Sequence, residues 1–139
     1  MIKLVIDANI LFAALIKKST TADLIVTGNF NLYAPEFILD EFKKYEKIIL
    51  NKTHRSKKEF EKFLDLLKRR ITFIPRKRIL NFLEQGRQIS PDPKDAIYFS
   101  LAIAMNAKVW SNDKRLKANQ KQIKVLTTSE ILEWIKSKK

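Results

Sequence analysis

The chain of 139 residues contains no cysteine and a single histidine, His54. The absence of cysteine excludes disulfides, thiolate zinc sites and cysteine nucleophiles. One histidine also argues against a multi-histidine zinc site and a Ser–His relay. A metal site in this chain would therefore be built from oxygen ligands, which favour hard cations such as Mg²⁺ and Mn²⁺.

Glycine and proline are scarce, with 2 and 4 residues. This scarcity argues against long flexible linkers and leaves no glycine-rich phosphate-binding loop. No apolar run approaches the roughly 18 residues that cross a bilayer. Asp7 and Asn9 interrupt the apolar N-terminal segment, and no small-residue cleavage site follows it. We therefore expect a cytoplasmic protein without a membrane anchor.

The chain is long and apolar enough to form an ordinary core, with 45% hydrophobic residues. This predicts one compact domain over residues 1–139. Apolar runs predict strands at Ile2–Ile6, Asn31–Ala34, Ile71–Ile74, Lys108–Ser111 and Ile123–Leu126. Periodicity and capping residues predict helices over 9–17, 20–27, 35–50, 57–70, 78–86, 92–106 and from Thr128 or Ser129 onward. This alternation predicts an α/β fold with a mainly parallel sheet and helices on both faces.

Positive charge is concentrated in the middle of the chain. The net charge is +13, and residues 43–87 hold 15 Lys/Arg against 5 Asp/Glu. Such a basic surface suits a polyanionic partner, although a solvated Lys-rich surface would give the same composition. The candidate nucleic-acid-binding residues are Arg55, Lys57, Lys58, Arg76, Lys77, Arg78, Lys114 and Arg115.

Two aspartates follow predicted strands directly. Asp7 comes after Ile2–Ile6 and Asp113 after Lys108–Ser111. The carboxyl ends of parallel strands lie on one edge, where such sheets bind ligands, so both carboxylates can face one crevice. Each aspartate taken alone is also explained as the cap of a turn.

Two further acidic residues lie on predicted helices. Glu41 falls inside the apolar sector formed by Ile38, Phe42 and Ile49. A carboxylate at such a position needs a cation or hydrogen bonds to compensate for its burial. The alternative is that Glu41 lies at the margin of the sector and reaches water. Asp92 has the position of an N-cap before Pro93. Asp95 could be the acid of the same capping pair, but four carboxylates on one edge of the fold need an explanation beyond capping. Several acids in one crevice would repel one another unless a metal ion neutralised them.

These segments resemble the PIN-domain nuclease family. The resemblance rests on Val5–Leu11, Ile38–Phe42 and the stretch from Asp92 to Asp113, and it covers nearly the whole chain. It implies a three-layer α/β/α domain in which Asp7, Glu41, Asp95 and Asp113 are the catalytic and metal-binding acids. Asn9, Ser111 and Asn112 would support that centre through hydrogen bonds, beside Asp92.

The resemblance also implies cleavage of RNA with Mg²⁺ or Mn²⁺. Many compact members of the family are toxins of toxin–antitoxin pairs, usually dimeric and silenced by a partner protein. The expected partners are therefore RNA, a second copy of the chain and, for a toxin, an antitoxin.

Three other classes remain as alternatives. A haloacid-dehalogenase-like phosphatase would carry Asp-x-Asp after its first strand, whereas Asp7-Ala8-Asn9 lacks the second acid, and a receiver domain would carry paired acids there. A non-catalytic nucleic-acid-binding protein with the same fold would bind tightly, show no turnover and be indifferent to chelators.

Overall fold

A five-stranded parallel sheet forms the centre of the molecule. The computed structural model describes residues 1–16, 20–118 and 122–137. The strands are β1 (Lys3–Ile6), β2 (Asn31–Pro35), β3 (Ile71–Ile74), β4 (Lys108–Trp110) and β5 (Val125–Leu126). They pair in parallel in the order β3-β2-β1-β4-β5. Leu4, Val5 and Ile6 of the central strand are fully buried, as expected for a strand covered on both faces.

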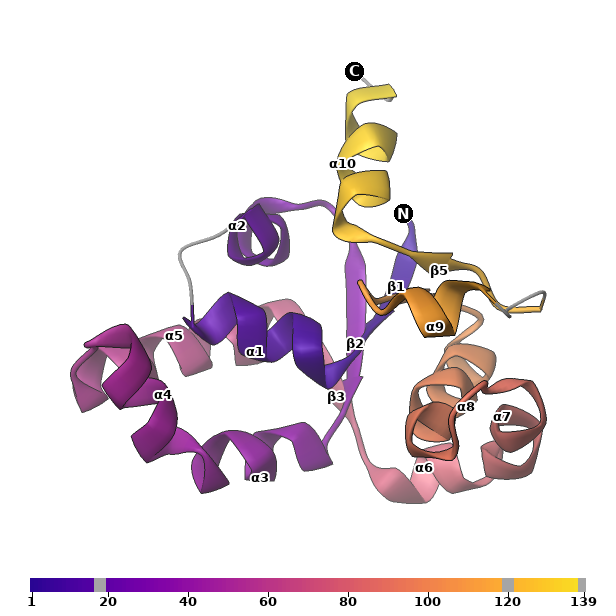
Figure 1. Ribbon diagram of the computed structural model, residues 1–139, viewed down its shortest axis with the longest axis horizontal. Coiled ribbons are helices and arrows are strands. Elements are labelled where there is room, and N and C mark those ends of the chain that lie inside the picture. Colours follow the sequence, from indigo (N-terminus) through magenta and orange to yellow (C-terminus); the bar gives the residue numbers. More distant parts are fainter. Residues whose placement is uncertain (17–19, 119–121, 138–139) are drawn as a thin grey trace.

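The connections between strands place helices on both faces. The helices are α1 (Ala8–Ile16), α2 (Thr20–Thr27), α3 (Phe37–Lys44), α4 (Glu46–Thr53), α5 (Lys57–Arg70), α6 (Arg76–Leu80), α7 (Leu83–Ile89), the 3₁₀ turn η1 (Pro93–Asp95), α8 (Ala96–Met105), α9 (Lys114–Ala118) and α10 (Thr128–Ser137). The chain runs from β1 outward to β3, then crosses back to β4 and β5. Right-handed connections that run toward β3 place their helices on one face of the sheet, and those that run toward β5 place theirs on the other face. Figure 1 shows this separation, with α1 to α5 on one side and α6, α7 and α8 on the other. The predicted three-layer α/β/α architecture is confirmed.

Several local predictions are confirmed. Strand β3 and helix α2 have the predicted bounds. Helix α5 begins with the predicted capping box, in which the Ser56 hydroxyl accepts from the Glu59 amide and the Glu59 carboxylate accepts from the Ser56 amide. These features depend on neighbours in the sequence, which explains why sequence patterns predict them.

The single helix predicted over 35–50 is wrong. The chain leaves the helical conformation at Tyr45, with φ −101° and ψ 11°, and α4 then continues to Thr53. The Tyr45 ring packs edge-on against Phe12 of α1, with ring centroids 6.1 Å apart, beside the Phe12–Phe42 pair at 5.1 Å. Apolar spacing continues through the break, so periodicity alone does not detect it.

The predicted helix over 78–86, which would end at Gly86, is also wrong. Two short helices occupy this region, and Gly86 lies inside the second, α7. Helices α7 and α8 pack closely at this residue. A β-carbon at position 86 would lie 2.6 Å from the Ala96 carbonyl oxygen and 2.8 Å from the Ser100 amide nitrogen. Gly86 is therefore required for the close approach of two helices rather than for a helix end.

We expect Gly86→Ala to destabilise the protein by about 1–3 kcal/mol, since overpacking forces backbone to move. The Ser100 hydroxyl, which would also touch the added carbon, is held by a 2.7 Å hydrogen bond to the Ala96 carbonyl. Chemical denaturation measures the loss, and Gln85→Ala, at an exposed position of α7, is the matched control. A Gly86→Ala protein as stable as the control would contradict this packing argument.

The C-terminal region differs from prediction in two details. The segment after Asp113, for which the sequence predicts neither a helix nor a strand, contains the short helix α9. The cap of α10 is Thr127 rather than Thr128 or Ser129. The Thr127 hydroxyl accepts from the Glu130 amide at 3.2 Å, and the Glu130 carboxylate accepts from the Thr127 amide at 3.1 Å. This reciprocal pair is a capping box one residue earlier than expected.

Candidate active site

The strand order reverses between β1 and β4. Open parallel sheets bind ligands outside the carboxyl ends of the strands at such a reversal. Asp7 follows the carboxyl end of β1, and Ser111 to Asp113 follow that of β4. The two strands are direct neighbours, with Ile6 opposite Trp110. The topology therefore places these polar residues on the same edge of the sheet, at the position where ligands bind.

Asp7 is a buried carboxylate, with 4% of its surface exposed. Its Oδ1 accepts a hydrogen bond from the Ile10 amide at 3.0 Å, and its carboxylate also accepts one from the Ser111 side chain. Burial raises the pKa of Asp7 above its ordinary value, and the charge of Asp113 raises it further, whereas these hydrogen bonds lower it. The structure thus keeps a carboxylate where its charge is disfavoured, which is typical of functional sites.

Ser111 links the two aspartates. It is fully buried, and its hydroxyl oxygen accepts a hydrogen bond from the Asp113 amide at 3.1 Å. Because the same hydroxyl donates to Asp7, Ser111 holds the Asp113 loop against the end of β1. Ser111 therefore contacts two of the candidate acids.

Asp113 forms an ion pair with Arg115. Its Oδ2 lies 3.2 Å from the Arg115 guanidinium, and its Oδ1 accepts from the Arg115 amide at 2.9 Å. These hydrogen bonds lower the pKa of Asp113. The Arg115 side chain is 79% exposed, so it is free to leave Asp113 when another cation binds there. Arg115 is a candidate for nucleic-acid binding by sequence, whereas in the structure its guanidinium contacts Asp113.

Asp95 and Asp92 have different environments. The Asp92 side chain accepts from the Lys94 amide at 2.9 Å and caps η1 with Pro93 in its first turn, as predicted. Asp95 precedes α8 and makes no capping hydrogen bond with its side chain. Burial raises the pKa of Asp95, and the charges of Asp92, Asp7 and Asp113 add to this effect. Asp95 therefore shares an electrostatic environment with the two strand-end aspartates.

Tyr98 connects this environment to Glu41. Its ring is buried, but its hydroxyl lies near polar groups. Burial raises the pKa of Tyr98, and the charges of Asp7, Asp95 and Glu41 raise it further, whereas a backbone hydrogen bond at Ala8 lowers it. Glu41 is half-buried, and its charge raises the pKa of the same hydroxyl that the aspartates affect. Sequence reasoning missed this role of Tyr98, although its place one turn after Asp95 was a signal.

The acidic side chains lie in one region, but they are not close enough to one another to bind a single metal ion together. Within residues 1–16, 20–118 and 122–137, no three His, Cys, Asp or Glu side chains lie close enough together to hold a metal ion. The donor chemistry nevertheless fits a hard cation, because every candidate ligand is a carboxylate. Movement of side chains, above all Asp113 away from Arg115, would have to bring them together.

Asn9 and Asn112 lie at the rim of this edge. Both are exposed, and together with Asp113 they line a hollow of about 310 Å³. Asn112 also fastens the loop to α10, since its Nδ2 donates to the Thr128 hydroxyl at 3.1 Å and its Oδ1 accepts from the Thr128 amide at 2.9 Å. The Trp110 indole donates to the same hydroxyl at 3.0 Å. Thr128, which sequence reasoning did not assign to the site, therefore anchors the loop that carries Asp113.

Apart from Arg115, which pairs with Asp113, the candidate nucleic-acid-binding residues fall into two groups. Arg55 has a structural role, since its guanidinium donates to the Leu15 carbonyl at 2.7 Å and lies 5.1 Å from the centre of the Phe63 ring. Exposed positions on α5, α6 and α9 hold Lys57, Lys58, Arg76, Lys77, Arg78 and Lys114.

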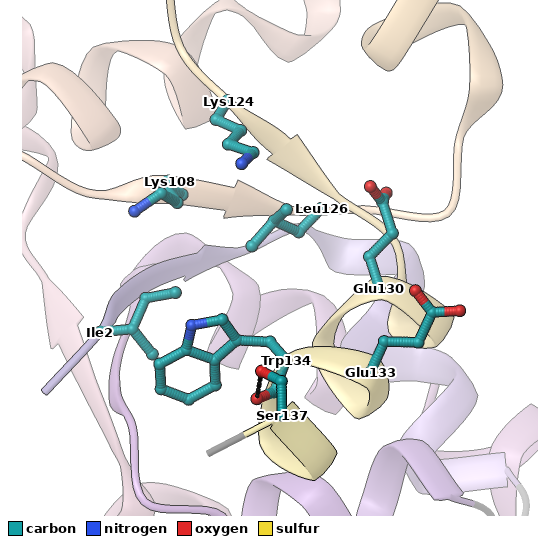
Figure 2. Close-up of a pocket in the computed structure, with 8 residues that line it drawn as sticks. All are labelled: Ile2, Lys108, Lys124, Leu126, Glu130, Glu133, Trp134 and Ser137. Carbon is teal, nitrogen blue, oxygen red and sulfur yellow. Dashed lines mark hydrogen bonds between the residues drawn. The ribbon is translucent and has the colours of Figure 1, made fainter.

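A hollow on the other edge of the sheet has a different character. It measures about 420 Å³ and includes Lys108 and Lys124, near the amino ends of β4 and β5. Figure 2 shows these lysines across from Glu130 and Glu133, with the Trp134 indole beside Ile2. Trp134 packs against Phe30, with ring centroids 6.0 Å apart. None of the four candidate acids lines this hollow.

The sheet and its acidic edge define an α/β protein with carboxylates at a topological switch point, where open parallel sheets generally bind ligands. The PIN domain family model matches residues 5–133, so the chain belongs to the PIN domain family, a family of nucleases. The predicted family is thus confirmed.

The fold is similar to that of a chain in the crystal structure of VapBC2 from Rickettsia felis bound to a DNA fragment from their promoter. The TM-score is 0.65 and the sequence identity 18%, over 91% of this chain and 98% of that chain. At this identity the likeness supports the fold alone. No curated protein sequence matches the chain. None of the helices in the described part of the chain is long and apolar enough to span a membrane.

Proposed function

We propose that the chain is a metal-dependent ribonuclease, formed by residues 1–139 as one domain, that hydrolyses RNA phosphodiester bonds. The observation that carries this proposal is the grouping of Asp7, Asp95 and Asp113 at the strand reversal, with the pKa of two of them raised. The fold holds carboxylates that repel one another, and a cation bound between them would compensate this repulsion.

We propose Asp7, Glu41, Asp95 and Asp113 as the residues that hold Mg²⁺ or Mn²⁺. Such an ion would supply an activated water nucleophile and charge stabilisation for phosphodiester hydrolysis. The chain's own contribution is positional. Ser111 orients Asp7 through its hydroxyl, and the hydrogen bonds of Asn112 to Thr128 fix the loop that carries Asp113.

RNA as the substrate is supported by the charge of the chain. Its net charge of +13 favours a polyanion, and the exposed cations on α5 and α6 add to the attraction. A non-catalytic nucleic-acid-binding protein with this fold is the second candidate, because the same charge would serve it. The phosphatase alternative is disfavoured by Asn9, which is exposed where a second acid would be needed.

We further propose a role as the toxin of a toxin–antitoxin pair, acting in the cytoplasm as a homodimer. The similarity to a chain of the VapBC2 complex supports this proposal, as does the compact size of the chain. Co-purification with the product of a neighbouring gene would identify the antitoxin.

Incubation of the purified protein with labelled RNA tests the enzymatic proposal. We expect cleavage with Mn²⁺ and none with EDTA, with the Asp7→Asn protein as the control for contaminating nuclease. Tight RNA binding without turnover in Mn²⁺, unaffected by EDTA, would instead identify a non-catalytic binder.

The metal proposal also predicts a thermal shift. Mn²⁺ should raise the melting temperature of the wild type, because a ligand at 100 times its Kd stabilises the native state by about 2.7 kcal/mol. We expect a much smaller shift for Glu41→Gln, which removes one negative ligand. Asp40→Asn changes the exposed neighbour on the same helix and should keep the full shift. Equal shifts in all three proteins would remove Glu41 from the metal site.

A further inference from the structure

Three cations surround a separate hollow beside the acidic edge. The hollow measures about 280 Å³, and Arg76, Arg87 and Lys94 lie around it. Its apolar surface includes Phe37, Leu83 and Ile97. The three cations come from α6, α7 and η1, which the fold brings together although they are separated in the sequence. Of the three, the sequence analysis singles out Arg76 alone.

The topology puts this hollow on the same edge as the candidate active site. Phe37 follows the carboxyl end of β2, and Arg76 follows that of β3. Strand β3 lies two strands from β1 in the sheet, or about 10 Å at the usual spacing. The Phe37 ring lies 6.5 Å from the ring of Tyr98, whose hydroxyl is in the acidic environment. Lys94 directly precedes Asp95. The hollow is therefore adjacent to the proposed site of cleavage.

The charges of the hollow favour an anion. All three cations are exposed, and the ion pairs found among the described residues, Arg115–Asp113 and Lys117–Glu130, involve none of them. Three like charges around one hollow repel each other, so an anion between them is stabilised by all three. Guanidinium groups match the geometry of phosphate oxygens. The half-buried Phe37 ring offers an apolar surface for an unstacked base.

We infer that this hollow binds a backbone phosphate, with its neighbouring base, of a single-stranded RNA that continues past the cleaved bond. The inference rests on the proposed function, because it takes the acidic edge as the place where the RNA is cleaved. It adds Arg87 and Lys94 as substrate-binding residues. A single strand is required because a base in a duplex is stacked and cannot reach Phe37.

Binding without cleavage tests the inference. The affinity for a short fluorescein-labelled single-stranded RNA is measured by anisotropy in EDTA, at several salt concentrations. The triple variant Arg76→Gln/Arg87→Gln/Lys94→Gln should bind roughly tenfold more weakly at low salt. Its slope of log K against log salt should fall by about 0.7 for each phosphate that the variant no longer neutralises. The same variant should lose less affinity for duplex RNA.

The matched control is Lys62→Gln/Lys68→Gln/Arg69→Gln. It removes the same charge from exposed positions of α5, and Arg69 lies near the amino end of β3, opposite Arg76. Its affinity should fall by less than threefold, on the order expected for a diffuse surface charge. Equal losses in the two triple variants would overturn the inference. Unchanged RNA binding, with loss of binding to a labelled poly-glutamate peptide, would also overturn it in favour of an acidic protein partner. Because cleavage is not measured, failure of the proposed enzymatic activity leaves this result independently interpretable.

Discussion

Asp7→Asn is expected to abolish RNA cleavage while leaving the metal-free protein as stable as the wild type or more stable. Loss of a group that only supports a metal ligand typically costs 10–100-fold in activity or metal affinity, so loss of a ligand should cost at least about 100-fold. The asparagine keeps a side-chain oxygen for the hydrogen bond from the Ile10 amide. The substitution removes a negative charge that is disfavoured by burial and by repulsion from Asp113.

The gain in stability should depend on pH. Because the pKa of Asp7 is raised in the folded state, the folded protein binds its proton more tightly than the unfolded chain does. The wild type therefore loses stability as the pH rises from the ordinary value of 3.8 through the raised value. The Asn variant lacks this loss, so its advantage should be absent below that window and complete above the raised pKa.

Melting curves of both proteins in EDTA across this pH range check the result, together with cleavage assays in Mn²⁺. Asp23→Asn, at an exposed position of α2 away from the site, controls for the loss of one negative charge. A fall of several degrees in the Asp7→Asn protein at neutral pH would show that Asp7 is a structural cap. Retained cleavage would remove it from catalysis.

Asp95→Asn should remove most activity, by at least about 100-fold on the same reasoning, with little effect on the fold. Its side chain makes no capping hydrogen bond, and its pKa is raised by burial and by three neighbouring aspartates. Asp92→Asn should retain substantial activity. Its side chain accepts from the Lys94 amide, and asparagine is nearly as good a cap as aspartate.

Kinetics of both variants at fixed Mn²⁺, with melting curves beside them, separate the two roles. Asp92→Ala removes the cap altogether and should cost about 0.5–2 kcal/mol of stability. A dead Asp92→Asn enzyme with an active Asp95→Asn enzyme would reverse our assignment of the third acid.

Features that depend on a few adjacent residues were determined by the sequence alone. The run Ile2–Ile6 predicts a buried strand because β-branched and apolar residues fit a strand covered on both faces. Ser56 and Glu59 predict the start of α5, and Asp92 with Pro93 predicts the cap of η1, because capping groups bond to amides only two or three residues away. The alternation of strands and helices then implied the parallel sheet, and with it the common edge of Asp7 and Asp113.

Features that depend on contacts between distant segments were decided only by the tertiary structure. The break at Tyr45 and the position of Gly86 inside α7 accompany packing against α1 and α8. The bond from Ser111 to Asp7 joins segments from opposite ends of the chain, and the bonds between Asn112 and Thr128 join the loop after β4 to α10. The hollow of Arg76, Arg87 and Lys94 likewise exists only because α6, α7 and η1, in the connection from β3 to β4, lie side by side in the fold. Periodicity and capping act over a few residues, whereas these contacts are set by strand order and by which side chains close packing brings within reach.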